Sequence, residues 1–116
     1  MRIIVIGAGK VGYTLAEHLT SEEHDVTVID KSSDVIDRCS GSLDVICIKG
    51  NGANAKVLLE AGVDKANIVI ASTESDESNM LSCLIAKRLG AHSLRLCRRA
   101  RAKARYPFGG APIMGT

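Results

Sequence analysis

Five short apolar runs divide the chain at regular intervals. Four of them, at residues 2–6, 26–29, 45–48 and 68–71, are rich in valine and isoleucine and are followed by a glycine or a polar residue. Continuous apolar runs of this length are typical of strands that are buried on both faces of a sheet. A fifth and weaker run covers residues 93–97. The pattern therefore predicts five strands.

Between these runs, apolar residues recur three or four positions apart, as they do on one face of a helix. The apolar positions of four predicted helices lie within residues 11–19, 35–39, 54–61 and 80–89. Gly41, Gly62 and Gly90 follow the last three and are placed to end them. Before the last helix, Thr73-x-x-Asp76 fits a capping box, so we expect one of the polar residues in this stretch to cap it.

Strands and helices that alternate with tight links predict an α/β fold. We expect a Rossmann-like, doubly wound parallel sheet with strand order 3-2-1-4-5 and helices on both faces. The order reverses between the first and fourth strands. Ligands of such sheets bind at this point, outside the carboxyl ends of the strands. Residues 1–92 form the predicted domain.

The remaining residues, 93–116, form an atypical basic tail. Residues 91–116 carry six basic and no acidic residues, whereas residues 1–90 carry nine basic and thirteen acidic residues, a net charge of −4. Both prolines lie in the tail, in a stretch that is typical of coil. We expect the tail to be poorly ordered and not to bind nucleic acid, because it offers only Tyr106 and Phe108 as stacking groups.

The cysteines and histidines do not have the spacing of a metal site. Cys39, Cys47, Cys83 and Cys97 form no CxxC pair, and each lies among apolar residues. Buried free thiols in a reducing compartment explain them best. We therefore predict no metal site, and we find no nucleophile with a partner base that would indicate catalysis.

One motif carries ligand chemistry, the sequence Gly7-Ala8-Gly9-Lys10-Val11-Gly12, which has the form GxGxxG. It follows a predicted strand and opens a predicted helix. An acid, Asp30, ends the second strand 18 residues after Gly12, close to the spacing of about 20 that is typical of dinucleotide-binding domains. The glycines permit a tight turn, close approach of a diphosphate and close packing of the helix on the sheet. Free N–H groups at the helix start hold phosphate oxygens.

Asp30 indicates which nucleotide the loop would hold. Its carboxylate can accept hydrogen bonds from ribose hydroxyls and would repel a 2′-phosphate, which favours NAD or an adenine nucleotide over NADP. The neighbouring Lys31 weakens this preference, because a lysine there could help to bind a 2′-phosphate. Lys10 is a cation in the first turn of a helix, where it is unfavourable without an anionic ligand.

Two further pairs of residues lie where the predicted sheet brings them to the same edge. Asn51 and Gly52 follow the third strand, where an adenine could lie or where they form only a turn. Ser72 and Thr73 follow the fourth strand, across the reversal point from Gly7. They either cap the last helix or contact the ligand, and the sequence leaves both open.

Several longer segments resemble a known family. These are GAGKVGYTLAEHL, VTVIDKS, KGNGAN and LLEAGVDKANIVIASTESDESNMLSCLIAKRLGA, which occur in order within residues 1–91. Together they are similar to the TrkA-N domain, the nucleotide-binding lobe of the RCK (KTN) family that regulates potassium transporters and channels. The stretch AGVDKANIVIASTESDESN is far more specific than GxGxxG. The likeness ends after Ala91.

The resemblance implies a sensor and not an enzyme. Such domains bind NAD(H), or ATP, ADP or AMP, and pass the ligand state to a membrane potassium transporter or channel. It implies a homo-oligomer in the cytoplasm, at the inner face of the membrane. The alternative is the cofactor domain of an NAD-dependent oxidoreductase. On this chain the resemblance places the phosphate loop at 7–12, the ribose acid at Asp30 with Lys31 beside it, and the fourth-strand edge at Ser72 and Thr73.

Overall fold

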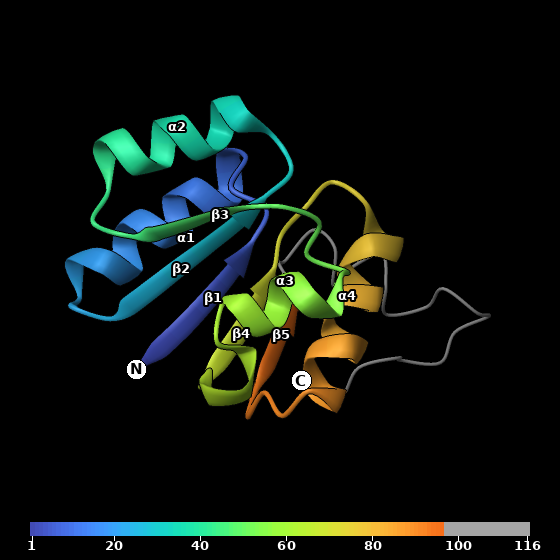
Figure 1. Cartoon of the computed structure of the whole chain (residues 1–116). Coiled ribbons are helices and arrows are strands. Elements are labelled where there is room, and N and C mark those ends of the chain that lie inside the picture. The colour runs from blue at the N-terminus through green and yellow to red at the C-terminus, as the bar shows by residue number, and fades with distance from the viewer. Residues whose placement is uncertain (97–116) are drawn as a thin grey trace.

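The computed structural model describes residues 1–96, which form one five-stranded parallel sheet in the order β3-β2-β1-β4-β5 (Figure 1). The strands are β1 (Arg2–Ile6), β2 (Asp25–Asp30), β3 (Ile46–Lys49), β4 (Ile68–Ala71) and β5 (Leu94–Leu96). The helices are α1 (Lys10–Ser21), α2 (Ser33–Ser42), α3 (Ala55–Glu60), the short 3₁₀ helix η1 (Val63–Lys65) and α4 (Asp76–Arg88). The predicted fold class and strand order are confirmed.

The differences from the sequence prediction are local. The 3₁₀ helix η1 was not predicted, and it follows Gly62, whose φ of 80° ends α3 as expected. The capping box at Thr73 is wrong, because the N-cap of α4 is Ser75, whose hydroxyl accepts the N–H of Ser78 at 3.1 Å. Residues 97–116, most of the predicted tail, lie outside the described residues, so the domain boundary at residue 92 stays a prediction.

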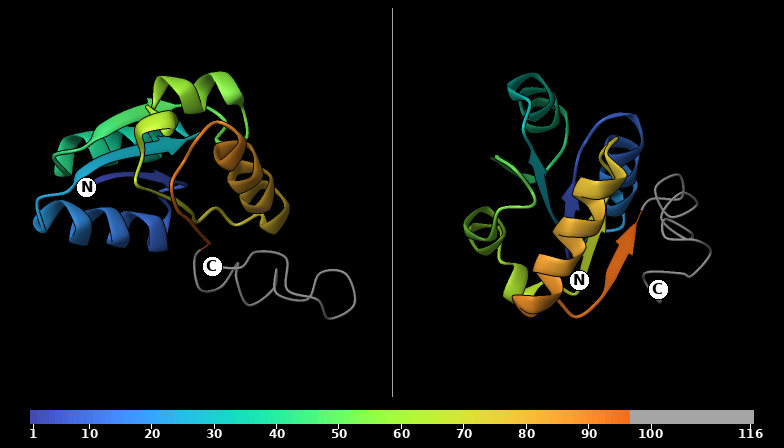
Figure 2. Two further views of the ribbon diagram at one scale, coloured as in Figure 1. Left: turned by 90° about the horizontal axis from the view of Figure 1, so that it is seen from below. Right: turned by 90° about the vertical axis from the view of Figure 1, so that its right-hand side faces the viewer.

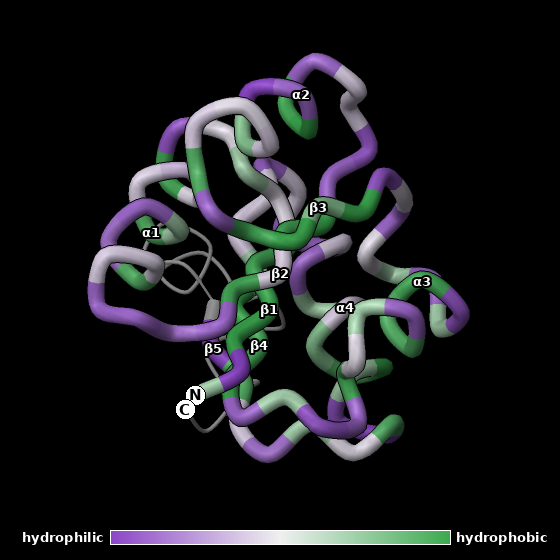
Figure 3. The backbone as a smooth tube through the Cα atoms, turned by 60° about the vertical axis from the view of Figure 1, so that its left-hand side comes forward, coloured by the Kyte–Doolittle hydropathy of each residue, from purple (hydrophilic) through white to green (hydrophobic). Residues whose placement is uncertain are grey.

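β1 is the central strand, and its side chains alternate between two cores. Ile4 and Ile6 belong to the core under α3, η1 and α4, whereas Ile3 and Val5 belong to the core under α1 and α2. All four are at most 2% exposed. In the left view of Figure 2, α1 lies below the strands and α3 above them. Figure 3 shows the hydrophobic stretches of the strands gathered between the helices. Burial on both faces explains why β1 is a continuous apolar run.

Side chains cap three of the four α-helices within residues 1–96. Ser32 caps α2, Asn54 caps α3 and Ser75 caps α4, each by accepting a backbone N–H from the first turn. α1 is the exception, since its N-cap is Gly9 and no side chain caps it. The first N–H groups of α1 are therefore left for another partner. This uncapped helix start lies within the glycine motif, because α1 begins at Lys10.

The cysteines within residues 1–96 are free thiols, as predicted. Cys39 and Cys83 are fully buried and Cys47 is half-buried. Burial raises the pKa of all three, and it raises the pKa of Cys83 to about 11. These thiols are therefore protonated near neutral pH and act as small apolar side chains in the core.

Leu58 and Leu59 are neighbours in α3 with opposite environments, since Leu58 is 0% exposed and Leu59 is 50% exposed. We expect Leu58→Ala to lower the free energy of unfolding by about 3 kcal/mol, because it leaves a cavity in the core. Leu59→Ala, the matched control, should lower it by less than about 1 kcal/mol. Urea unfolding of both variants measures this difference. Equal losses would contradict the placement of α3.

Candidate nucleotide-binding site

The candidate site lies at the carboxyl ends of the strands, where the loops after β1, β2, β3 and β4 meet (Figure 1). A cleft of about 350 Å³ opens there, which we call the carboxyl-end cleft. Most of the predicted site residues line it: Gly7, Gly9, Asp30, Lys31, Asn51, Gly52, Ser72 and Thr73. The sheet thus brings together four separate segments of the chain at the predicted reversal of strand order.

The first and last glycines of the motif allow α1 to pack tightly against the end of β1. Gly7 has a φ of 89°, and a Cβ there would lie 2.8 Å from the Thr73 methyl carbon. A Cβ at Gly12 would lie 1.8 Å from the carbonyl oxygen of Gly7. Either side chain would force the loop apart.

Gly9 has a different environment. A Cβ at Gly9 would meet no protein atom within 4 Å, so no described part of the protein needs a glycine there for space. Its φ of −68° is also available to any residue. Gly9 lies beside both the cleft and the uncapped start of α1. Because it has no side chain, a ligand can approach the backbone there. The first turn of α1 contains no acidic residue, which keeps the positive end of its dipole available to an anion.

Asp30 holds the loop as well as facing the cleft. Its two carboxylate oxygens accept the N–H of Ala8 at 2.8 Å and the N–H of Ser32 at 2.9 Å. A carboxylate oxygen has two lone pairs, so each oxygen can accept a further hydrogen bond. Asp30 can therefore anchor the glycine loop to the end of β2 and still accept hydroxyl groups from a ribose.

The remaining predicted loop residues differ in burial. Ala8 is buried, whereas Lys10 and Val11 are exposed at the start of α1. Neither Lys10 nor Val11 lines the carboxyl-end cleft, but both belong to the uncapped first turn. Their backbone N–H groups are therefore available to a ligand beside the cleft.

Asn51 and Gly52 form a turn that shapes one wall of the cleft. The Asn51 side chain accepts the N–H of Ala53 at 2.8 Å, which is the local turn that the sequence left open as one alternative. Gly52 is buried, and a Cβ there would lie 2.2 Å from a methyl carbon of Ile6. Only glycine lets this turn lie against β1.

Ser72 does not cap a helix. Its hydroxyl donates to the carbonyl oxygen of Gly7 at 2.7 Å, and its N–H donates to Ile6 at 2.8 Å. Ser72 therefore joins the end of β4 to the first residue of the motif. Its position in the cleft is as predicted, but the bond to Gly7 makes it a support for the loop.

Asn79 was not identified from the sequence as a site residue. It is 0% exposed in α4, and it makes three hydrogen bonds with Thr73. Its side-chain oxygen accepts the Thr73 N–H at 3.0 Å and the Thr73 hydroxyl at 2.6 Å, and its side-chain nitrogen donates to the Thr73 carbonyl at 2.9 Å. The available signal was an asparagine on the buried face of a helix, where an amide must be hydrogen-bonded.

Arg38 was also missed, and no local pattern indicates it. From α2 its guanidinium lies 4.7 Å from the centre of the Tyr13 ring and 3.5 Å from the carbonyl oxygen of Ala8. The Ala8 peptide is thus contacted by Asp30 at its N–H and by Arg38 at its carbonyl. The cation also adds positive charge beside the loop.

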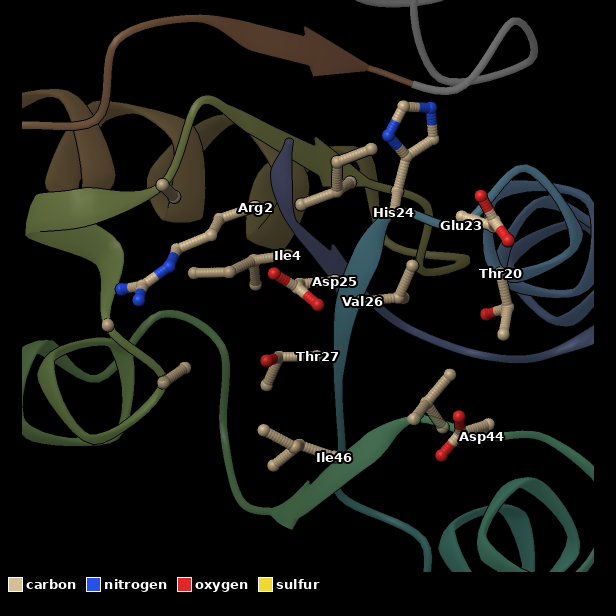
Figure 4. A pocket seen from close by; sticks show the side chains of 15 residues that line it. Arg2, Ile4, Thr20, Glu23, His24, Asp25, Val26, Thr27, Asp44 and Ile46 are labelled. Carbon is tan, nitrogen blue, oxygen red and sulfur yellow. The ribbon is translucent and has the colours of Figure 1, made fainter.

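A second and larger cleft, of about 690 Å³, lies at the opposite, amino ends of the strands (Figure 4). We call it the amino-end cleft. Its wall carries Arg2, Asp25, Thr27 and Asp44 among others, and none of the predicted site residues. Among residues 1–96, no group of three or more His, Cys, Asp or Glu side chains is arranged to hold a metal ion. The predicted nucleotide-binding residues therefore do not lie at the larger cleft.

Comparison with known proteins agrees with this geometry. The sequence profile of the TrkA-N domain matches residues 3–107. The chain belongs to the TrkA-N domain family. A Trk system potassium uptake protein TrkA homolog from Archaeoglobus fulgidus is 49% identical over 94 residues, which are 81% of this chain and 21% of that protein. This chain thus spans about a fifth of the length of that relative.

Solved structures share the fold of this TrkA-N domain. A GsuK channel bound to NAD superposes with a TM-score of 0.74 at 22% identity, covering 90% of this chain and 19% of the channel chain. GsuK bound to ADP gives a TM-score of 0.72 at 21% identity, covering 95% of this chain and 30% of the other. None of the helices within residues 1–96 has the length and apolar character that a membrane crossing needs.

The three hydrogen bonds between Asn79 and Thr73 give a prediction for stability. We expect Asn79→Ala to lower the free energy of unfolding by about 2 kcal/mol, since it removes three hydrogen bonds between a fully buried side chain and the half-buried Thr73. Asn67 is the matched control, because it is exposed and accepts one bond, from the N–H of Arg2. Asn67→Ala should lower the free energy of unfolding by about 1 kcal/mol or less.

Urea unfolding, followed by circular dichroism, measures both variants. A loss for Asn79→Ala no larger than that for Asn67→Ala would show that Asn79 does not hold the loop after β4.

Proposed function

We propose that this chain is the nucleotide-sensing domain of a potassium uptake regulator, binding NAD(H) or an adenine nucleotide in the carboxyl-end cleft. The observation that carries the proposal is the uncapped start of α1, with the open backbone of Gly9 beside a cleft that contains Asp30. A diphosphate fits this arrangement, because the free N–H groups and the helix dipole favour an anion. The TrkA-N membership and the GsuK structures with NAD and ADP support the same ligand class.

The residues have distinct proposed roles. The backbone of 7–12 holds the phosphates. The resemblance to the TrkA-N family implies that the exposed side chain of Lys10 reaches a terminal phosphate. Asp30 accepts the ribose hydroxyls, and its negative charge disfavours a 2′-phosphate. Asn51 and Gly52 form the wall after β3, whereas Ser72 and Thr73 form the edge after β4.

The proposed role is regulation and not catalysis. We place the chain in the cytoplasm, in a homo-oligomer at the inner face of the membrane, where it acts on a potassium transporter or channel. The name of the Archaeoglobus relative supports this partner class. Ligand binding changes the state of such an assembly only if the ligand binds one conformation more tightly than the other. The loop after β4 joins the glycine motif to α4 through Ser72 and Asn79, which offers a route for that difference.

Thermal unfolding with added nucleotide tests the proposal. Ligand at 100 times its dissociation constant stabilises a protein by ~2.7 kcal/mol, which is about 10 °C for a domain of this size. We expect NADH, NAD⁺ or ADP to give a shift of this order. Asp30→Asn should remove most of the shift, because it removes the charge and one acceptor that the ribose needs.

Asp37→Asn is the matched control, since Asp37 is an exposed acid of α2 and does not line the cleft. The unfolding temperature of each variant without ligand separates loss of binding from loss of the fold. A folded wild-type protein that none of these nucleotides stabilises would overturn the proposal. A larger shift with NADPH would overturn the role of Asp30.

A further inference from the structure

Ser82 is a buried hydroxyl without a partner in the described part of the chain. It lies in α4, is 1% exposed and lines the carboxyl-end cleft. Two neighbouring polar side chains are paired, since Ser75 caps the helix and Asn79 binds Thr73. Thr14 and Thr20 in α1 satisfy their hydroxyls by donating to the carbonyl four residues earlier, but Ser82 makes no such bond within residues 1–96. An unpaired buried hydroxyl is unfavourable unless something else binds it.

The residues around Ser82 indicate what kind of ligand group would bind its hydroxyl. Ser75, Ser78 and Ser82 are spaced three and four residues apart, so they share one face of α4 and line the cleft together. Ile6 and Ile29, from β1 and β2, also line it and provide apolar side chains. A cleft with apolar side chains on one element and hydroxyls on another suits a ring that is apolar on its faces and polar at its edge.

The position along the ligand follows from the order of the strands. Asp30 is at the end of β2, and the phosphate loop follows β1, the next strand in the sheet. Continuing in the same direction leads to β4 and α4. A dinucleotide with one ribose at Asp30 and its diphosphate on 7–12 therefore extends its second nucleoside toward α4.

The charged residues near α4 also fit the second nucleoside of a dinucleotide. Glu74, in the loop before α4, lines the cleft, and Lys31 is the only Lys or Arg among the described lining residues. An acid beside α4 disfavours a phosphate there. It favours a neutral or cationic group, such as the oxidised nicotinamide ring.

We propose that Ser82 hydrogen-bonds the carboxamide-bearing ring of a nicotinamide dinucleotide, so that it determines a preference for the dinucleotide over ligands that lack this ring. The proposal rests on the proposed function, because it needs the adenosine half to bind at Asp30 and the glycine loop. Ser82 is then a specificity-determining residue of the same cleft, and its unpaired hydroxyl is explained.

Isothermal titration of the full chain with NAD⁺ and with ADP-ribose tests this proposal. ADP-ribose has the adenosine, the diphosphate and the second ribose but lacks nicotinamide. Ser82→Ala should weaken NAD⁺ binding about 5- to 10-fold, the range of one neutral hydrogen bond, and change ADP-ribose binding less than about twofold. Ser40→Ala, an exposed serine of α2, is the matched control and should change neither affinity.

The unfolding temperature without ligand provides a second readout. Ser82→Ala should not lower it, because the hydroxyl has no protein partner within residues 1–96 to lose. Unchanged NAD⁺ affinity in the variant would mean that Ser82 holds only a water molecule, and it would overturn the proposal. Equal weakening for both ligands would also overturn it. A wild-type protein that binds neither ligand would overturn this proposal, and it would overturn the proposed function as well only if ADP also fails to bind.

Discussion

The close contact between the start of α1 and the end of β1 is the constraint on which the site depends. Gly12 lies so close to the carbonyl of Gly7 that a Cβ would come within 1.8 Å of that oxygen. This contact directs the first turn of α1 at the edge of the sheet where the strands end. The uncapped start of α1 then lies beside the carboxyl-end cleft, which Gly9 lines. A larger side chain at either glycine would change the direction of the helix and close the site.

The loop is held from several sides, which makes it a preorganised site. Asp30 holds the Ala8 N–H from β2, Ser72 holds the Gly7 carbonyl from β4, and Arg38 reaches the Ala8 carbonyl from α2. These bonds fix the backbone before any ligand arrives, so less conformational entropy is lost on binding. They also connect the loop to three separate elements, β2, β4 and α2. The proposed regulatory role needs such connections, because the ligand state must reach parts of the protein that do not touch the ligand.

The sequence predicted the fold and the edge of the sheet at which the candidate residues meet, because both depend on local patterns. Apolar runs and helical spacing are local, and so is the glycine motif followed by Asp30. The sequence offered several polar residues as the N-cap of α4, and the structure selects Ser75. The capping box from Thr73 to Asp76 is wrong, since these residues offer similar local chemistry and the sequence alone does not decide among them. Bonds between distant residues could not be predicted. Arg38 and Ala8 are 30 residues apart, and Ser72 and Gly7 are 65 apart. Asn79 could have been noticed as a polar residue on a buried helix face, but its partner could not.

The central claim is that nucleotides bind at the carboxyl ends of the strands, on the backbone of the glycine loop. An NMR titration of ¹⁵N-labelled protein with NAD⁺ or ADP tests this most directly, because it follows each backbone amide separately. We expect the largest shifts at Gly9, Lys10 and Val11, with smaller shifts at Lys31 and Thr73. Shifts concentrated at Arg2, His24 and Asp44, around the amino-end cleft, would contradict it.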